Sequence, residues 1–397
     1  EEEMPYFLGK NKIRIRGILK ETLSVTPEHP VLALKRADLE CIRHRKLLCT
    51  RKNNRCLKKK NEYSRDCFYL KEQRSQPKWI SVKDLCIGDY VVVSAINEAK
   101  DVKELKISEI LSDENFSKYL SIKNGKVVFI NHDQRKRSGK FNKKIKPIPN
   151  RIKVDKDFLI LVGYWIAEGS FDKAIKTIDF SFNKNEHKYH TEVLRIMNKK
   201  FNLRTKIEFA KKQNTVRLRF HSKVVARFFY KLFNKGFASK DLPLWFLTLP
   251  REKQIFFLTS LFRGDGHLSA RRGKQNLFFL QLSNKNLSLK VWSILQRLGF
   301  EFNIQETKNK YKDRQGHQKT TKNISYRISA SPQRCSFFAK LVNPEIELPK
   351  KRIRNQYLQL NGYSFRPIDS IDKTIYQGLV YNLEVEEDHS YLANGVA

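Results

Sequence analysis

The chain contains 397 residues, with 79 Lys and Arg against 41 Asp and Glu, and carries a formal net charge of +38. A field of this sign and size attracts polyanions and disfavours a small neutral ligand as the main partner. Nucleic acid is therefore the first expected partner, and an anionic membrane surface is the second. The 27 Phe, 15 Tyr and 4 Trp residues argue against a disordered basic chain, because they supply enough apolar surface for two or three domain cores.

Nothing in the sequence predicts a membrane protein. No apolar stretch approaches the ~20 residues needed to span a bilayer. Residues Glu1–Met4 lack the basic and then apolar pattern of a signal peptide. We therefore expect a cytoplasmic protein with no membrane partner.

The first part of the chain is expected to contain short strands. Residues 12–19 alternate polar and apolar side chains, as a half-buried strand does. Residues 79–93 combine a Gly-Asp turn with a β-branched strand. Residues 38–76 are polar and basic, which indicates an insertion, and residues 99–150 are weakly patterned, basic and proline-containing, which indicates a linker.

The basic insertion at 38–76 holds Cys41, Cys49, Cys56 and Cys67. Thiolates surrounded by cations favour metal binding or reactivity, so a structural Zn²⁺ site at these four cysteines is one interpretation. The tight Cys-x2–4-Cys spacing of common zinc sites is absent. Free cysteines in a basic, DNA-contacting loop are the preferred interpretation.

Residues 151–355 contain a weak internal repeat, whose copies begin near residues 158 and 255. Each copy starts with an apolar helix that ends in an acid followed by glycine. Small residues lie four positions apart in each helix, so the two helices can pack side by side with their backbones in close approach. The small pairs are Gly163 with Ala167 and Ser260 with Gly264, and we expect Trp165, Phe257 and Phe262 to be buried in two half-domain cores.

The acids at the two helix ends are Glu168 and Asp265, and the glycines that follow fit left-handed caps. A carboxylate at a helix C-terminus faces the negative end of the dipole, and the two like charges also repel each other. A divalent cation would offset both penalties, and carboxylate oxygens suit Mg²⁺. Such a cation can activate water and stabilise the leaving oxygen of a phosphodiester.

Amphipathic strands in the same region are expected to face DNA. In residues 215–220, alternation places Val216, Leu218 and Phe220 on one face and Arg217 and Arg219 on the other. A two-stranded ribbon fits the major groove, where Arg and Gln side chains read base edges. By the same pattern we expect Gln281 and Arg327 to contact DNA, while lysines in residues 307–322 hold phosphates.

The two acid-Gly segments resemble the LAGLIDADG (dodecapeptide, DOD-type) motif of homing endonucleases. The resemblance implies an α+β saddle of two pseudo-symmetric αββαββα halves over residues 151–355, in a monomer that cuts double-stranded DNA with Mg²⁺. The family's catalytic and metal-binding acids map onto Glu168, with Glu in place of Asp, and Asp265. Its active-centre lysines map onto Lys240, in a Lys-x-x-Pro setting, and onto Lys350.

The flanks resemble an intein, whose Hint domain is mostly β. Residues 1–98, interrupted by the 38–76 insertion, and residues 356–397 would form this module with the nuclease inserted in it. The resemblance implies that His29 protonates the leaving group of an acyl shift and that Thr26 helps to hold the His29 side chain. It also implies that His389 assists asparagine cyclisation. The host protein (the exteins) would be the partner in cis. The chain lacks the initial Cys or Ser and the terminal His-Asn, so we expect splicing to be incomplete.

These observations favour a site-specific double-stranded DNA endonuclease, with autocatalytic cleavage as an activity of the intein. The alternative is a DNA-binding regulator or inactive intein remnant on the same fold, which binds DNA but does not cut it. A protein that only splices is disfavoured by the missing terminal residues.

Overall fold

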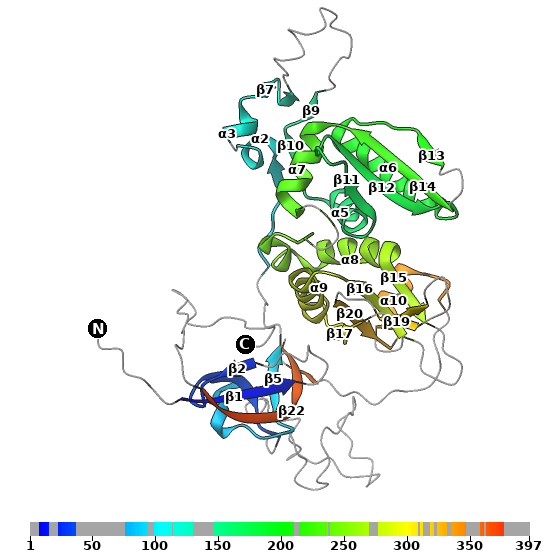
Figure 1. Cartoon of the computed structure of the whole chain (residues 1–397). Coiled ribbons are helices and arrows are strands. Elements are labelled where there is room, and N and C mark those ends of the chain that lie inside the picture. Colours follow the sequence, from blue (N-terminus) through cyan, green and yellow to red (C-terminus); the bar gives the residue numbers. More distant parts are fainter. Residues whose placement is uncertain are drawn as a thin grey trace, which may run out of the picture. The chain divides into compact units, whose positions relative to one another are not determined.

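The computed structural model divides the chain into two compact units, each described by itself (Figure 1). The β unit comprises Glu1–Asn97, Leu295–Glu306 and Lys351–Ala397, and the α/β unit comprises Glu98–Ile294 and Thr307–Lys350. The residues that the structure describes are 8–15, 23–36, 76–93, 99–112, 114–129, 147–209, 214–234, 236, 239–269, 277–308, 310–312, 318–320, 324–331, 335–346, 358–360 and 363–376.

The β unit is built on a sheet with the strand order β2-β1-β22-β5-β3-β4, and β21 pairs with β22. The bounds are β1 Leu8–Ile15, β2 Leu23–Val25, β3 Pro30–Leu34, β4 Lys78–Ser81, β5 Tyr90–Val93, β21 Leu358–Leu360 and β22 Tyr363–Tyr376. A 3-10 helix, Val82–Asp84, joins β4 to the turn before β5. Strands were expected in 12–19 and 79–93, and the first of these strands begins earlier, at Leu8.

Strand β22 joins segments that are far apart in the sequence. Its first half pairs with β5, from Ser364 opposite Val93 to Pro367 opposite Tyr90. Its second half runs antiparallel to β1, as far as Tyr376 opposite Leu8. The sheet of the β unit therefore needs strands from both flanks of the α/β unit.

A buried arginine ties the segment Leu295–Glu306 into the β unit. The side chain of Arg366 on β22 is 1% exposed. Its Nη1 donates to Asn303 Oδ1 at 2.9 Å, and its Nη2 donates to Gln296 Oε1 at 2.9 Å and to the Phe302 carbonyl. These hydrogen bonds hold β22 against the segment Leu295–Glu306.

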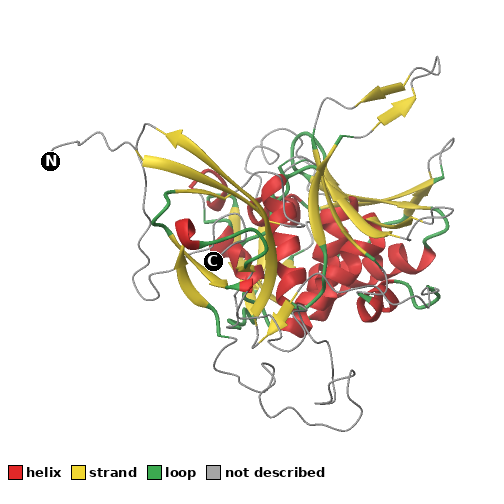
Figure 2. Cartoon of the chain, turned by 90° about the horizontal axis from the view of Figure 1, so that it is seen from below, coloured by secondary structure: helices red, strands yellow, loops and turns green. Residues whose placement is uncertain are grey.

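The α/β unit, together with the segment Leu295–Glu306 counted with the β unit, contains two copies of an αββαββα arrangement, as expected from the sequence (Figures 1 and 2). The sheets have the orders β11-β12-β14-β13 and β15-β16-β20-β17. The first copy is α5 Lys156–Glu168, β11 Gly169–Phe171, β12 Thr177–Asn183, α6 His187–Phe201, β13 Ile207–Phe209, β14 Thr215–His221 and α7 Lys223–Phe233. The second copy is α8 Arg251–Asp265, β15 Gly266–Ser269, β16 Leu277–Leu282, α9 Lys285–Arg297, β17 Asn303–Thr307, β20 Ser325–Ala330 and α10 Ser336–Val342.

Two smaller elements connect the parts of these copies. A hairpin of β18 Lys310–Lys312 and β19 Gln318–Thr320 lies between β17 and β20 in sequence. A 3-10 helix, Leu244–Leu247, precedes α8. No helix in the described part of the chain is long and apolar enough to cross a membrane.

Each copy has an aromatic core between its sheet and its helices. Trp165 of α5 lies 5.9 Å from Phe180 of β12 and 5.5 Å from Phe229 of α7, measured between ring centroids. In the second copy, Phe262 of α8 lies 5.0 Å from both Phe278 and Phe338. Trp165, Phe257 and Phe262 are at most 1% exposed, so the predicted burial of these side chains is confirmed.

Residues 99–150 contain regular structure where the sequence indicated a linker. The elements are β6 Glu104–Lys106, α2 Ile107–Ile110, α3 Glu114–Ser117, β7 Leu120–Lys123, β8 Lys126–Phe129 and β9 Ile148–Pro149, and β6 pairs with β10 Arg151–Lys153. Asn124 and Gly125 connect β7 to β8 with φ of 48° and 69°, and two positive φ angles are what a type I′ hairpin turn requires. The Asn-Gly pair was the sequence signal for this hairpin.

An aromatic cage joins this small module to α7. Lys223 Nζ lies 4.3 Å from the ring centroid of Phe129, 5.5 Å from that of Phe116 and 5.7 Å from that of Tyr119. Each contact of this kind contributes about 0.5–2 kcal/mol, depending on how far the cation is desolvated. Burial also lowers the pKa of Lys223, with Arg227 as a second cause.

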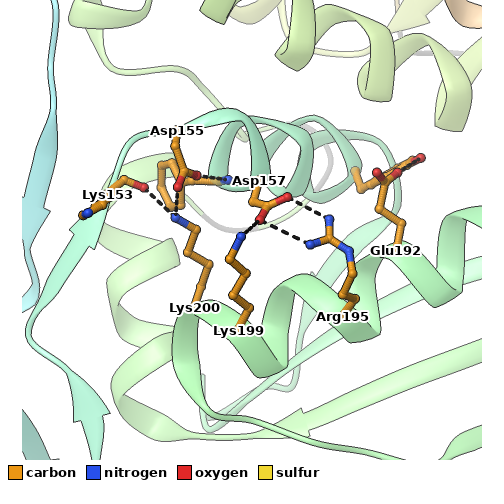
Figure 3. A network of polar contacts seen from close by, with 9 residues as sticks. Lys153, Asp155, Asp157, Glu192, Arg195, Lys199 and Lys200 are labelled. Atoms are coloured by element: carbon orange, nitrogen blue, oxygen red, sulfur yellow. Dashed lines mark hydrogen bonds and ion pairs between the residues drawn. The ribbon is translucent and has the colours of Figure 1, made fainter.

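Ion pairs hold the N-terminal end of α5 against α6 (Figure 3). Asp155 caps α5 through a backbone N–H of its first turn, and Lys200 Nζ lies 2.5 Å from the same carboxylate. Asp157 is paired with Arg195 at 2.7 Å and with Lys199 at 2.6 Å, and the hydrogen bond from Arg195 holds its pKa well below the ordinary value. Carboxylates are favourable at this positive end of the helix dipole, so α5 is anchored at the end opposite to Glu168.

Candidate active site

Helices α5 and α8 pack with their backbones in close approach, as the small residues predicted. A Cβ added at Gly163 would lie 2.0 Å from Ser260 Oγ and 2.5 Å from the Phe257 carbonyl oxygen. A Cβ added at Gly264 would lie 2.5 Å from the Cβ of Ala167. Any larger side chain at these glycines would push the helices apart, and with them the two helix ends.

Glu168 and Asp265 are the last residues of α5 and α8. The prediction of left-handed caps at the glycines that follow is wrong, because Gly169 has φ −77° and ψ 145°, and Gly266 has φ −78° and ψ 141°. The chain instead continues directly into β11 and β15. A Cβ would lie 2.4 Å from the Trp165 carbonyl oxygen at Gly169, and 2.2 Å from that of Phe262 at Gly266, so glycine is required by this close approach rather than by a positive φ.

The two carboxyl groups are partly buried, and the charge of Asp265 adds to the cost of ionising Glu168. Burial raises the pKa of Glu168 to about 8, and the charges of Asp265 and then Glu186 add to this effect. Burial also raises the pKa of Asp265 to about 6. Lys240 opposes both shifts. Within the described residues, neither carboxylate accepts a hydrogen bond.

Lys240 lies beside the two acids without forming a direct ion pair with either. Its side chain is buried, and its Nζ donates to the carbonyl oxygens of Trp165 at 2.8 Å and Ile166 at 2.9 Å. These carbonyls belong to the last turn of α5, and that of Trp165 also accepts the backbone N–H of Gly169. Burial lowers the pKa of Lys240 to about 8, against the opposing effects of Asp265 and Glu168. The structure thus brings together three of the four residues expected at the catalytic centre.

Glu186 belongs to this environment although the sequence gave no sign of it. It is the residue before α6, and its Oε2 accepts the backbone N–H of Asn183 at 2.8 Å. The charge of Glu186 raises the pKa of Glu168, whereas the pKa of Asp265 is raised by burial alone. The two acids therefore have unequal surroundings.

The outer face of the first sheet carries the arginines predicted to contact DNA. Arg217 is exposed. Arg219 is instead paired with Asp179, with 3.0 Å between Nη2 and Oδ2 and 3.2 Å from Nε to each carboxylate oxygen. The alternation of Thr177–Asn183 places Asp179 on this face, so the acid could have been found from the sequence.

The outer face of the second sheet carries Gln281 and Arg327 opposite each other. Arg327 Cζ lies 4.8 Å from the ring centroid of Phe279, and its Nη2 donates to Gln281 Oε1 at 3.2 Å. Gln281 Nε2 in turn donates to Ser325 Oγ at 2.7 Å. These side chains hold one another in place, so we expect them to make contacts of fixed geometry with a ligand.

Thr26 and His29 lie in the turn between β2 and β3 of the β unit. The backbone N–H of His29 donates to the Thr26 carbonyl at 3.2 Å, and the His29 carbonyl accepts from Val82 at 3.1 Å. Burial lowers the pKa of His29. The other predicted site residues lie outside the described residues: Lys350, His389, and the four cysteines Cys41, Cys49, Cys56 and Cys67.

Two segments of the chain match known domain families. Residues 252–339 match the LAGLIDADG-like domain, and residues 159–229 match the WhiA LAGLIDADG-like domain. These segments lie in the second and the first copy of the αββαββα arrangement, and each copy begins with one of the acid-bearing helices. The α/β unit therefore contains two LAGLIDADG-like halves beside the small module within residues 99–150.

Curated relatives are longer than this chain. An uncharacterized protein of Methanocaldococcus jannaschii, MJ0043, is 32% identical over 96% of this chain and 43% of its own length. The ATP-dependent DNA helicase Hel308 of Thermococcus kodakarensis is 26% identical over 65% of this chain and 23% of the helicase. A DNA polymerase of Thermococcus sp. (strain GE8) is 29% identical over 44% of this chain and 10% of the polymerase. The chain spans less than half the length of these relatives.

In a structural comparison, about half of this chain matched two solved structures. The full-length DUF199/WhiA structure from Thermatoga maritima is 14% identical, with a TM-score of 0.31 over 48% of this chain and 56% of that chain. The I-DmoI structure in complex with DNA and Mn is 18% identical, with a TM-score of 0.31 over 49% of this chain and 99% of that chain.

Proposed function

We propose that the α/β unit is a divalent-metal-dependent endonuclease that cuts double-stranded DNA at a specific site. The observation that carries this proposal is the placement of Glu168 and Asp265 at the ends of two helices in close contact. Within the described residues neither carboxylate accepts a hydrogen bond, and the pKa values of both groups are raised, although the chain has a net charge of +38. Two adjacent carboxyl groups favour a cation as ligand, and the positive charge of the whole chain favours a polyanion.

The donor set of the site fits Mg²⁺ or a similar hard cation. Mg²⁺ is commonly held by one or two carboxylates and completed by water and substrate phosphates. Glu168 and Asp265 are the residues that would hold it, and groups of three or more candidate ligands are absent from the described residues. Bound there, the cation would supply Lewis-acid stabilisation of a phosphodiester and a more acidic water.

Lys240 would position Glu168 and lower the electrostatic cost of the site. Its ammonium group satisfies the last-turn carbonyls of α5, which fixes the backbone that carries Glu168. Its charge favours the ionised form of both acids. Because Lys240 is buried, it is better placed to act on these acids than to reach a phosphate of the DNA.

The outer faces of the two sheets would bind the DNA. They carry Arg217 and Arg219 in the first half, and Gln281 and Arg327 in the second. A ribbon of antiparallel strands fits the major groove, and these side chain types read base edges. A monomer with two such halves would bind about one helical turn of duplex on each side of its pseudo-two-fold axis.

The test of this function is cleavage of DNA that contains the host gene without the coding sequence of this chain. Unmutated protein with Mg²⁺ is expected to make one double-strand cut. Glu168→Gln and Asp265→Asn should bind the same DNA without cutting it. Lys188→Met is the control, because it removes a charge from an exposed position of α6 and leaves the helix ends and the outer faces of the sheets intact. Cutting that persists in both acid variants would reject the proposed site.

A second candidate is a DNA-binding protein of the same fold that does not cut. The match of residues 159–229 to a WhiA-type domain favours it. In the same assay it predicts specific binding by the unmutated protein and no cut with any divalent cation. Retention of both acids and of Lys240 makes the endonuclease the preferred function.

We further propose that the β unit is a Hint-like module and that the whole chain is an intein with host sequences as partners in cis. The matched relatives include a DNA helicase and a DNA polymerase, and the match covers 23% and 10% of these proteins. A segment shared by proteins of different activities is what a self-contained insertion predicts. Pairing of β22 with β1 and β5 places the two flanks in one sheet, which agrees with a nuclease inserted in a β module.

In this module, His29 and Thr26 would act at the upstream junction. Expression of the chain between its natural flanking sequences tests this role. His29→Ala should accumulate uncleaved precursor, and Glu168→Gln should not. If the unmutated precursor remains intact as well, the module has lost splicing, and this result leaves the endonuclease proposal unaffected.

A further inference from the structure

Three residues form a row across the outer face of the first sheet. Strands β11, β12 and β14 are neighbours in this sheet (Figure 1). Ser170 of β11 lies opposite Asp179 of β12, and Asp179 lies opposite Arg219 of β14. Side chains directly opposite each other in antiparallel strands point to the same face. The neighbours of Asp179 and Arg219 along their strands are buried in the core: Ile178, Phe180, Leu218 and Phe220. The row therefore belongs to the opposite face, which is the surface assigned to DNA.

The guanidinium of Arg219 is fixed along one of its edges. Asp179 engages the Nε and Nη2 atoms, at 3.2 and 3.0 Å. Thr205 Oγ1 donates to the Arg219 carbonyl at 2.6 Å and fixes the backbone as well. Asp179 is 5% exposed, whereas a third of the Arg219 side chain remains accessible. The carboxylate of Asp179 is therefore buried, while part of the Arg219 side chain is accessible to a ligand.

The free edge of Arg219 has a defined hydrogen-bonding capacity. Guanidinium carries five N–H donors in one plane, and Asp179 takes those on the Nε side. Within the described residues, Nη1 makes no hydrogen bond, so its two donors and the second donor of Nη2 point away from Asp179. Two donors side by side match the O6 and N7 acceptors that guanine shows in the major groove.

The second half of the protein has no such pair at the matching position. Gly169 pairs with Phe180, and Gly266 pairs with Leu280, so β12 and β16 can be aligned from these glycines. Asp179 then corresponds to Phe279, and Arg219 corresponds to Ser329. Neither Phe279 nor Ser329 can make a bidentate contact with a guanine. The ion pair is therefore a feature of the first half alone, and it makes the two half-sites unequal.

We propose that Asp179 is a positioning residue that presents the free edge of Arg219 to a single guanine in the half-site bound by the first LAGLIDADG-like half. The inference rests on the proposed function, because it requires the outer face of the sheet to enter the major groove. It adds one base pair of known identity to a target that is otherwise unspecified. A purely structural ion pair across two strands would stabilise the sheet and give no preference for a base.

The test is selection of bound sequences from random duplex DNA in EDTA, so that no cation supports cutting. The unmutated protein should enrich a site with an invariant guanine in one half. Arg219→Ala should lose the preference at that base pair only, by roughly 5- to 150-fold, the range of one bidentate contact. Arg217→Ala, which removes the same charge from the same strand and face, should leave that guanine unchanged.

Asp179→Asn separates positioning from structure. Removal of the negative charge should tighten binding to random duplex, while the preference at the same base pair falls. Loss of folding alone would weaken binding to every sequence equally, and thermal unfolding of each variant detects it. The inference is overturned if Arg219→Ala keeps the full preference, or if Asp179→Asn lowers all positions alike. No enriched sequence with the unmutated protein would instead reject the proposed function itself.

Discussion

The Nζ atom of Lys240 lies 2.8 Å from the carbonyl oxygen of Trp165, in the last turn of the helix that ends at Glu168. The lysine therefore acts on the backbone of α5 and on the electrostatic field around the two acids, rather than as a direct partner of a carboxylate. Lys240→Met keeps much of the volume and removes the cation, so it isolates this electrostatic role.

Lys240→Met is expected to abolish or strongly reduce cutting while DNA binding is retained. Without the cation, the pKa values of Glu168 and Asp265 rise further, and the affinity for Mg²⁺ falls because its ligands must be ionised. The carbonyl oxygens of Trp165 and Ile166 also lose the ammonium donor, and because that of Trp165 keeps the N–H of Gly169, the added cost is about 1–3 kcal/mol in total. Cleavage rate at several Mg²⁺ concentrations measures the effect. Lys290→Met is the control, since Lys290 pairs with Asp241 instead. Full activity at low Mg²⁺ would exclude this role.

The pH dependence of stability should report the raised pKa of Glu168. In the unfolded chain this carboxyl group ionises near 4.5, and in the folded protein near 8. Between these values the folded state holds a proton that the unfolded state has released, so stability falls as pH rises through this window. Glu168→Gln removes the loss and should be more stable than the unmutated protein at pH 8 without metal, on the order of 1–3 kcal/mol.

Urea unfolding at pH 4.5 and pH 8 measures this difference, which should vanish at the lower pH. Mg²⁺ at pH 8 should stabilise the unmutated protein more than Glu168→Gln, because a ligand stabilises the state that binds it. Equal stability of the two proteins at every pH would mean that Glu168 is ionised at ordinary cost. In that case the proposed crowding of charge at the helix ends would be incorrect.

Exchanging alanine and glycine between position 167 of α5 and position 264 of α8 tests the close packing of these helices. Gly264→Ala should destabilise the protein by about 1–3 kcal/mol, because its Cβ would lie 2.5 Å from that of Ala167. The double variant Ala167→Gly with Gly264→Ala should recover most of this loss, since the next nearest atom, Glu168 Cγ, is 3.4 Å away. Thermal unfolding of the single and double variants gives the coupling energy. Additive losses would show that the two helices are not in contact here.

Lys223→Met should weaken the attachment of the small module within residues 99–150 to α7. The variant loses the contacts of the ammonium group with Phe129, Phe116 and Tyr119, about 1–2 kcal/mol in sum at a partly desolvated site. Hydrogen exchange in β7 and β8 should become faster, while exchange in α5 and α8 stays unchanged. Lys188→Met, at an exposed position of α6, serves as the control. Uniformly faster exchange would indicate global destabilisation rather than local release.

The sequence predicted the repeated halves and the acid-bearing helices well, because their signals are local. Spacing of four between small residues fixes a helix face, and alternation in 215–220 fixes the faces of a strand. The conformation of Gly169 and Gly266 was predicted wrongly, because a helix that ends in glycine usually ends in a left-handed turn. Here the chain enters a strand at once, and that geometry depends on the sheet that receives it.

Other parts of the site depend on contacts that no sequence pattern reports. Glu186 raises the pKa of Glu168 only because the residue before α6 lies near the end of α5. The pairing of Asp179 with Arg219 requires the register of β12 against β14. The folded module within 99–150 was missed because its strands are short, although the Asn124-Gly125 turn marked one hairpin.

Strand β22 has a consequence for the order in which the protein folds. The sheet of the β unit needs residues 363–376 between β1 and β5, so during synthesis β1 emerges long before the strand that covers its edge. The halves of the α/β unit are built from nearer contacts and are complete in the chain earlier, and folding is faster when contacts are local. Synthesis from the N-terminus therefore lets the α/β unit fold first, and it leaves the first strands of the β unit as an open edge until the last ones arrive.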